Sequence, residues 1–160
     1  MRMIPRFGVV TLTMFGCVGC DQVSKSAARA FLEAGVTQSL LADSLRLQLV
    51  ENPGSFLSLG ASLPEPVRFA LLTAAVAVLL MGLVGAALFS SRLGPKGFIG
   101  LALVAGGGIG NLIDRLIHDG RVTDFLNIGI GPLRTGIFNL ADIAILAGAL
   151  LLFRRYRAQR

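Results

Sequence analysis

Charged residues are scarce in this sequence of 160 residues: they make up 15% of it, against 54% for hydrophobic residues. A soluble domain carries about 25% charged residues. The apolar residues also come in long blocks instead of alternating with polar ones, which is typical of membrane proteins. The low charge and the apolar blocks together exclude an ordinary soluble domain.

Histidine and cysteine are also rare, and this removes several kinds of chemistry. His118 is the only histidine, and no HExxH, GxSxG or SxxK signature occurs, so zinc hydrolysis and serine acyl transfer lack their usual residues. Cys17 and Cys20 form a single CxxC pair inside an apolar block, which is better interpreted as two small residues of a membrane helix. We therefore predict no metal site and no cofactor.

The excess of basic over acidic residues does not predict nucleic-acid binding. The net charge of +6 comes from 15 Lys and Arg against 9 Asp and Glu. Nucleic-acid binding needs a basic face on a soluble fold, whereas these cations lie between and beside apolar blocks.

Four apolar blocks predict four transmembrane helices, at about residues 7–26, 67–90, 97–115 and 136–154. A helix needs about 20 residues to cross the hydrocarbon core of a bilayer. Residues 69–89 form a run without charge, and the other blocks reach that length only with polar residues at their ends. We expect an all-α integral membrane protein with a single membrane domain over residues 1–160.

The cations favour an orientation with both termini in the cytoplasm. With the N-terminus inside, three short stretches without acids become cytoplasmic, and they hold eight cations: Arg2, Arg6, Arg92, Lys96, Arg154, Arg155, Arg157 and Arg160. The polar residues at the ends of the apolar blocks then all come to lie near the outer face. We expect these residues to converge at one membrane level.

The segment between the first two blocks predicts a small extracytoplasmic β-sheet at about residues 40–62. Residues 45–49 alternate leucines with polar residues, as in a half-buried strand. Asn52-Pro53-Gly54 is a turn signal, and Phe56, Leu57 and Leu59 are suited to a returning strand.

Acids inside apolar blocks need an explanation, because a charge at mid-helix costs about 2.5–3.5 kcal/mol. Asp142 lies five residues into the fourth block, where it has either a chemical role or a structural ion pair with Arg115. Asp21 and Lys25 have the i, i+4 spacing of a helical ion pair, which we predict to be structural. Asp114 and Arg115 are neighbours, so they point to different faces and need separate partners.

The glycine run in the third block predicts close helix packing. Gly106 and Gly110 form a GxxxG pair, which lets two helix backbones approach closely. A phosphate-binding loop is the rival interpretation, but such loops follow a strand and carry a lysine, and both features are missing here.

The remaining chemistry rests on carboxyl groups. Two close carboxylates cannot both ionise and share one proton. One of them then takes a proton from water while the other gives a proton to a departing amine. The composition allows an amide bond to be hydrolysed in this way without a metal, but it does not identify the residues.

Five short motifs in order carry a resemblance to a known family. They are Asp21-Gln22-Val23-Ser24-Lys25, Asn52-Pro53-Gly54, Gly106 to Arg115, Val122-Thr123-Asp124-Phe125 and Phe138-Asn139-Leu140-Ala141-Asp142. The series resembles the bacterial lipoprotein signal peptidases (signal peptidase II), whose motifs look like DQxSK, NxG, GGxxGNxxDR, VxDF and FNxAD. Each motif alone is weak, but the five cover nearly the whole chain in the right order.

The resemblance implies a multi-pass aspartyl protease of the bacterial inner membrane. Such an enzyme removes the signal peptide of a prolipoprotein, just before a cysteine that carries a diacylglyceryl group. The resemblance places the catalytic pair on Asp124 and Asp142, near the outer leaflet. Substrate binding and support fall on Asn52, Gly54, Asn111, Arg115 and Asn139, and structural polar roles on Asp21, Lys25 and Asp114. Prolipoproteins and membrane lipid are the implied partners, and we expect a monomer.

One segment departs from the family. Family members usually continue the NxG motif with Ala-Phe-Ser, whereas Ser55-Phe56-Leu57-Ser58 follows here. The bulky Phe56 stands where a small residue is expected, so the preference for lipid or peptide could differ.

Three other functions stay open. Val18-Gly19-Cys20 loosely resembles the cleavage site of a lipoprotein precursor, although three more apolar blocks follow it. A metal-dependent membrane transferase of phospholipid head groups would use Asp114, Asp124 and Asp142 to hold magnesium. A transporter would use the acids as a proton relay, but it needs access from both sides of the membrane.

Overall fold

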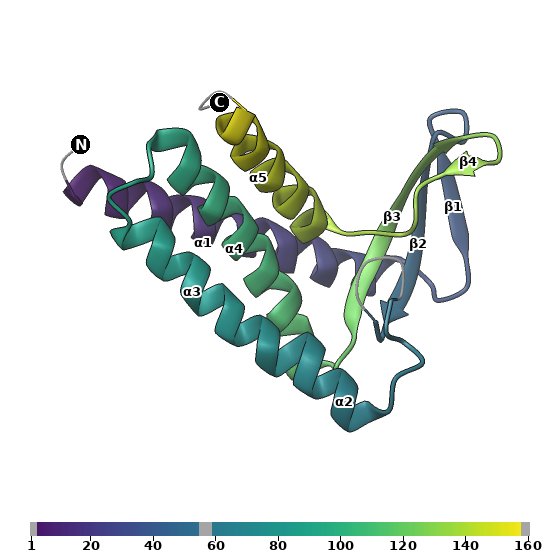
Figure 1. The fold of residues 1–160 in the computed structure, drawn as a ribbon. Coiled ribbons are helices and arrows are strands. Elements are labelled where there is room, and N and C mark those ends of the chain that lie inside the picture. Colours follow the sequence, from purple (N-terminus) through teal and green to yellow (C-terminus); the bar gives the residue numbers. More distant parts are fainter. Residues whose placement is uncertain (1–2, 55–58, 158–160) are drawn as a thin grey trace.

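Long helices form one part of the molecule, and a small sheet at one end of the helices forms the other (Figure 1). The computed structural model describes residues 3–54 and 59–157. The start of α1 (Met3–Phe31) and the end of α5 (Leu140–Arg157) lie at the end of the bundle away from the sheet (Figure 1). The described start of α1 and the described end of α5 therefore lie at the same end of the bundle.

The helices coincide broadly with the predicted apolar blocks, and α1 and α4 extend beyond them at both ends. After α1 come α2 (Glu65–Phe69), η2 (Ala70–Ala74) and α3 (Ala75–Phe89), which follow one another without a break, then α4 (Pro95–Ile117) and α5. The short η2 is one turn of π-helix. Among the described residues, three stretches are long and apolar enough to cross a membrane: Arg6–Phe31, Glu65–Phe89 and Pro95–Ile117. The structure thus has membrane helices, and α5 with 18 residues is not among these three.

The last helix begins four residues later than the predicted span at residue 136. The chain before it is extended, and Phe138 forms a bridge with Leu126 of the sheet. Asn139 then caps α5, because its side-chain Oδ1 accepts from the backbone N–H of Asp142 (3.1 Å). The Asp142 carboxylate accepts in turn from the backbone N–H of Asn139 (3.2 Å). This reciprocal capping box fixes the start of α5.

The sheet has four antiparallel strands in the order β1-β2-β3-β4. They are β1 (Thr37–Leu40), β2 (Leu45–Asn52), β3 (Val122–Ile130) and β4 (Leu133–Arg134). The strand predicted around residues 45–49 is confirmed as β2. The returning strand predicted after the turn falls mostly on residues 55–58, with Phe56, which lie outside the described residues. The neighbours of β2 are β1 and the distant β3. The sequence analysis predicts neither of these two strands.

Glycines of α4 allow α1 to approach it closely, as the GxxxG pair predicts. A Cβ on Gly106 would lie 2.9 Å from the Cβ of Cys17, and a Cβ on Gly110 would lie 2.6 Å from a carboxylate oxygen of Asp21. Helix α4 is the central helix, since it packs against α1, α3 and α5. The packing interpretation of the glycine run is confirmed.

We expect Gly106→Ala to destabilise the protein by about 1–3 kcal/mol, because the added methyl group overpacks the contact between α1 and α4. Gly19→Ala is the matched control, since nothing lies within 4 Å of a Cβ at Gly19. Thermal unfolding of both variants in detergent measures the difference. Equal stability of the two variants would show that the close approach is unimportant.

Arg6 has a structural role that its place among the cytoplasmic cations did not reveal. Its buried guanidinium donates to the carbonyl oxygens of Ala87 (2.8 Å), Ser90 (2.8 Å) and Ala86 (3.2 Å), at the end of α3. It also lies over the ring of Phe98. A cation that binds the last carbonyls of a helix stabilises the helix end. Arg6 thereby joins α1 to α3.

Candidate active site

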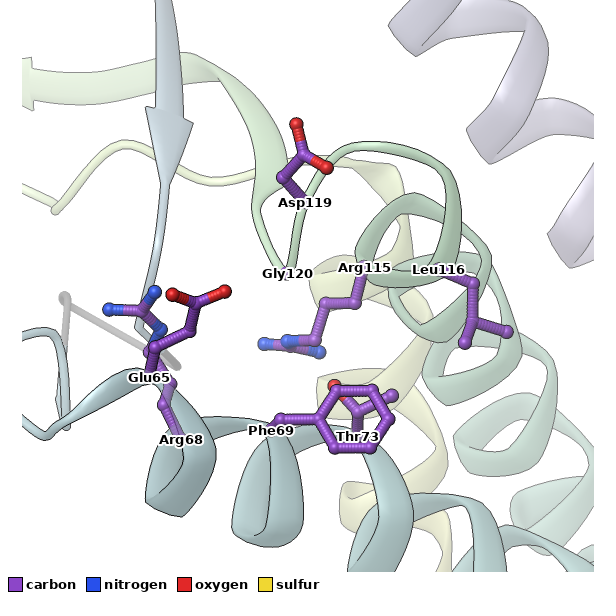
Figure 2. Close-up of a pocket in the computed structure, with 8 residues that line it drawn as sticks. All are labelled: Glu65, Arg68, Phe69, Thr73, Arg115, Leu116, Asp119 and Gly120. Atoms are coloured by element: carbon purple, nitrogen blue, oxygen red, sulfur yellow. The ribbon is translucent and has the colours of Figure 1, made fainter.

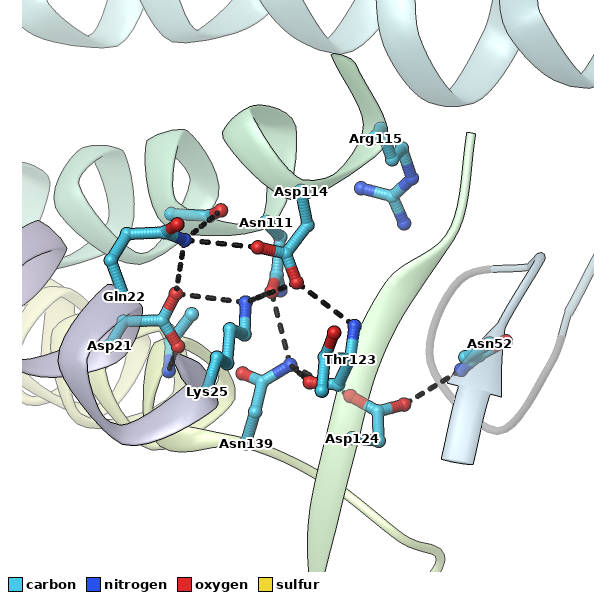
Figure 3. Close-up of polar contacts among 12 residues, drawn as sticks. Asp21, Gln22, Lys25, Asn52, Asn111, Asp114, Arg115, Thr123, Asp124 and Asn139 are labelled. Carbon is cyan, nitrogen blue, oxygen red and sulfur yellow. Dashed lines mark hydrogen bonds and ion pairs between the residues drawn. The ribbon is translucent and has the colours of Figure 1, made fainter. Parts of the chain in front are cut away.

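Polar side chains from all five motifs meet where the ends of α1, α4 and α5 lie against β2 and β3 (Figure 3). Most are buried, and Asp21, Lys25, Asp114 and Asn139 are 0% exposed. The predicted convergence of residues that are far apart in the sequence is therefore observed.

Lys25 is at the centre of a buried network of charges. Its Nζ lies 2.8 Å from Asp21 Oδ2 and 3.3 Å from Asp114 Oδ2, and it donates to Asn111 Oδ1 (2.8 Å). The predicted ion pair between Asp21 and Lys25 is confirmed, and the separate partner that Asp114 needs is Lys25. A buried lysine with three acceptors satisfies all of its donors.

The two acids of this network also bind the backbone of other elements. Asp21 Oδ1 accepts from the N–H of Ala141 in α5 (3.0 Å), and Asp114 Oδ2 accepts from the N–H of Thr123 in β3 (2.9 Å). The network therefore connects α1, α4, α5 and β3. It holds in place the two segments that carry Asp124 and Asp142.

Asp124 lies in β3 and is only 4% exposed. Its Oδ2 accepts from the side-chain amide of Asn52 at the end of β2 (2.9 Å), and its Oδ1 accepts from the amide of Asn139 (2.7 Å). The pairing of β2 with β3 brings Asn52 to this position, opposite Val122. Both carboxylate oxygens thus have a donor from a neutral amide.

Asp142 stands in the first turn of α5, where the capping box orients it. Its Oδ1 accepts from the side-chain amide of Asn111 in α4 (3.0 Å), while its Oδ2 accepts from the backbone N–H of Asn139. Among the described residues, Asp142 forms no ion pair with Arg115. The alternative interpretation of Asp142 as the partner of Arg115 in a structural ion pair is therefore wrong. Arg115 binds elsewhere.

Asn139 contacts both carboxylates at once. Its side-chain amide donates to Asp124, and its backbone N–H donates to Asp142. The same amide also lies 3.1 Å from Asn111 Oδ1, and Asn111 itself donates to Asp142. Two asparagines therefore bring together two carboxyl groups that lie 18 positions apart in the sequence.

Burial raises the pKa of Asp124 to about 6, because the charged form loses its hydration there. The hydrogen bond from Asn52 opposes this effect, and the charge of Asp142 adds to it. The influence of Asp142 on the pKa of Asp124 indicates that the two carboxyl groups interact electrically. A raised pKa beside a second carboxyl group is typical of sites that move protons.

This pKa predicts a pH-dependent difference in stability between the protein and its Asp124→Asn variant. A carboxyl group whose folded-state pKa is raised costs stability as the pH rises from about 4 to about 6, and the cost is complete above pH 6. The free energy of unfolding of the variant, minus that of wild type, should therefore increase by about 2–3 kcal/mol from pH 4 to pH 7.5. Unfolding at both pH values measures this gain. A difference that stays constant with pH would contradict the assignment.

Arg115 and Gly54 form a second contact beside the carboxyl groups. Arg115 Nη2 donates to the carbonyl oxygen of Gly54 (3.0 Å), and the N–H of Gly54 donates to Asn52 Oδ1 (2.9 Å). The turn that follows β2 is thus closed by the Asn52 side chain, as in an Asx turn. Arg115 Nε is buried and has no hydrogen-bond partner among the described residues.

The structure adds two residues that the sequence reading did not single out. Thr123 is 0% exposed, and its hydroxyl donates to Glu51 (3.0 Å) and accepts from Arg29 (2.6 Å). Gln22 donates to Asp114 Oδ1 (3.0 Å) and to the carbonyl oxygen of Gly110 (3.1 Å). Thr123 precedes Asp124 and Gln22 follows Asp21, each within one of the five motifs. Their positions in the motifs could have identified them as site residues.

Comparison with known proteins decides the family. The family model described as signal peptidase (SPase) II matches residues 13–156, most of the chain. This chain belongs to the signal peptidase II family. The family that the five motifs predict is thus confirmed.

Relatives of this signal peptidase II chain occur in several bacteria. It is 36% identical over 137 residues to a lipoprotein signal peptidase of Rhodococcus jostii, covering 82% of this chain and 64% of that protein. It is 38% identical over 132 residues to one of Pelotomaculum thermopropionicum, covering 82% and 80%. The chain thus spans less than two thirds of the Rhodococcus protein.

Solved structures share the fold of this signal peptidase II chain. A bacterial membrane enzyme solved by the in meso method at 2.3 Å resolution superposes with a TM-score of 0.82 at 22% identity, covering 94% of this chain and 88% of the other. A second, solved at 1.9 Å, gives 0.78 at 23% identity. The fold of this chain is therefore similar to that of solved bacterial membrane proteins.

Proposed function

We propose that this chain is an aspartyl endopeptidase that removes the signal peptide from diacylglyceryl-modified prolipoproteins. The bond cut is the one before the lipidated cysteine. Asp124 and Asp142 are the catalytic pair. The observation that carries this proposal is that Asn139 donates to both carboxylates, through its side chain to Asp124 and through its backbone to Asp142.

The mechanism needs one proton shared by the two carboxyl groups. The ionised member takes a proton from a water molecule, and the oxygen of this water attacks the carbonyl carbon of the scissile bond. The protonated member gives its proton to the departing amine of the cysteine. The raised pKa of Asp124 supports this scheme, because it lies in the range where a buried carboxyl group keeps a proton beside a second acid.

Neighbouring amides keep the pair oriented. Asn52, Asn111 and Asn139 each donate to a carboxylate oxygen, so rotation of either carboxyl group would break a hydrogen bond. Gly54 and Arg115 lie beside Asn52 and are proposed to contact the substrate. Asp21, Lys25 and Asp114 hold the helices together and take no part in the chemistry.

The membrane arrangement follows from the same placement. We propose four spans in one domain of the bacterial inner membrane, with α5 as the fourth span and both termini in the cytoplasm. The site then lies near the outer leaflet, where a substrate that is part signal helix and part lipid reaches the surface. The sheet provides Asp124 and Asn52 and so forms one wall of the site. We expect a monomer to be sufficient, because one chain provides every proposed residue.

The alternative of a metal-dependent head-group transferase is not favoured by these contacts. Holding magnesium would require Asp114 to join Asp124 and Asp142, but Asp114 accepts from Lys25, Gln22 and the N–H of Thr123. In the described part of the chain, no three Asp, Glu, His or Cys side chains are grouped as metal ligands. Cleavage is therefore expected to continue in EDTA.

Incubation of the purified protein with a diacylglyceryl-modified precursor and with its unlipidated counterpart tests the proposal. Mass spectrometry should find a product that begins at the lipidated cysteine, and it should find the unlipidated precursor intact. Equal cleavage of both precursors would contradict the proposed substrate. Loss of cleavage in EDTA would contradict the metal-free mechanism.

A further inference from the structure

A hollow of about 220 Å³ lies between α2, η2 and the end of α4, and the proposed reaction leaves most of its wall unused. It is lined by Glu65, Arg68, Phe69, Thr73, Arg115, Leu116, Asp119 and Gly120. Drug-sized ligands occupy pockets of about 300–1,000 Å³. The hollow is therefore suited to a small chemical group and is too small for a helix.

Three charged side chains face this hollow. Figure 2 shows the guanidinium of Arg115 directed toward the charged ends of Glu65 and Arg68, whereas the carboxylate of Asp119 points away. Arg115 is 9% exposed, and its buried Nε has no partner among the described residues. Within residues 3–54 and 59–157, the one hydrogen bond of the Arg68 side chain is a long one, of 3.5 Å, to the carbonyl oxygen of Ala61. Hydrogen-bond donors of Arg68 and Arg115 are thus available beside the carboxylate of Glu65, which is an acceptor.

The depth of the hollow in the membrane suggests its occupant. Glu65 is the first residue of one apolar stretch long enough to cross a membrane, and Ile117 is the last residue of another. The hollow lies between these two ends, where lipid headgroups meet the hydrocarbon. At its rim Phe69 and Leu116 are 57% and 63% exposed, as expected for side chains that contact acyl chains.

We propose that this hollow binds the headgroup of a bilayer phospholipid. The phosphate accepts from Arg68 and from Arg115 Nε, since guanidinium groups bind phosphate oxygens with paired, directional hydrogen bonds. Glu65 accepts from a donor at the outer end of the headgroup, either an ammonium or a hydroxyl group. Phosphatidylethanolamine and phosphatidylglycerol provide such a donor, and phosphatidylcholine does not. This site shares Arg115 with the proposed substrate contacts, and Arg68 and Glu65 have no role in the proposed cleavage reaction.

The π-helical turn supports the proposal. Single turns of π-helix inside α-helices are frequent at functional sites. Here η2 follows directly after Arg68 and Phe69, and it places the buried Thr73 in the wall of the hollow.

Native mass spectrometry of the purified full-length chain, equilibrated with equal parts of the three lipids, tests the proposal. Wild type should retain phosphatidylethanolamine or phosphatidylglycerol about tenfold more than phosphatidylcholine. Arg68→Gln should lower total retention about tenfold, because it removes a charged donor to the phosphate. Glu65→Gln should keep retention but lose the preference against phosphatidylcholine.

The control is Arg121→Gln, which removes an exposed cation next to the hollow but not in its wall. It should change neither retention nor preference. Equal loss of lipid in Arg121→Gln and Arg68→Gln would overturn the proposal, as would binding of inorganic phosphate without retention of any of the three lipids. If Arg68→Gln unfolds, a Glu65→Gln variant that keeps the wild-type preference overturns it. Retention of a synthetic prolipoprotein fragment in place of lipid would assign the hollow to the substrate instead.

Discussion

Replacing either Asp124 or Asp142 by asparagine is expected to lower cleavage of a lipidated precursor by about 100- to 10,000-fold, the range for loss of a general acid or base. Asparagine has nearly the same shape, but it neither takes a proton from water nor holds the shared proton. Each variant thus lacks one half of the proton transfer. The rate of product formation, followed by mass spectrometry, measures the loss.

The loss must be separated from a failure to fold. Both variants should be expressed, insert into the membrane and remain folded at the assay temperature, because asparagine keeps the shape of aspartate and lies beside amide groups that also pair with asparagine. Glu33→Gln is the matched control, an exposed acid just after α1, and it should cleave at the wild-type rate. Cleavage near the wild-type rate by Asp124→Asn or Asp142→Asn would remove that residue from the mechanism.

Lys25→Met is expected to be the most destabilising single change in the protein. It removes the cation that pairs with both Asp21 and Asp114, and all three side chains are 0% exposed. Breaking a buried ion pair by removing one partner costs about 3–5 kcal/mol. This is a large part of the free energy of unfolding of a typical protein, which is about 5–15 kcal/mol. Cleavage should fall as well, because Lys25 donates to Asn111, which orients Asp142.

Two further variants make this result specific. Lys96→Met removes an exposed cation at the start of α4 and should have little effect on unfolding. Adding Asp21→Asn to Lys25→Met should restore part of the stability, because one of the two unpaired carboxylates disappears. A Lys25→Met protein within about 1 kcal/mol of wild type would show that the buried network is not needed for stability.

The sequence was most informative about the helices and about the acids. Long apolar blocks predict membrane helices because the bilayer fixes their length, and α2 to α4 follow that prediction closely. The i, i+4 spacing of Asp21 and Lys25 predicts their ion pair, since both lie on one helix. Local rules of this kind need no knowledge of the tertiary fold.

The partner of β2 was not predictable in the same way. Val122–Ile130 is rich in strand-forming residues and ends at Gly131-Pro132, which are signals of a strand. Its pairing with β2, however, joins residues that are 70 or more positions apart, and no local pattern specifies such a pair. As a result, the contact of Asn52 with Asp124 became clear only from the fold.

The dual roles of single residues were also hidden. In the sequence, the charge of Arg6 indicates only the topology. In the structure Arg6 also caps α3, and this contact depends on where α3 ends in space. Asn139 and Asp142 form a capping box that sequence spacing allows one to expect. What spacing does not reveal is that the same asparagine also reaches Asp124.

The most direct test of the central claim compares the residual cleavage of Asp124→Asn, Asp142→Asn and the double variant in one long incubation. If the two carboxyl groups act as one unit, the double variant should be no slower than either single variant, because removing one member already stops the proton transfer. If the double variant is slower by the product of the two separate losses, the residues act independently, and the shared-proton mechanism is wrong.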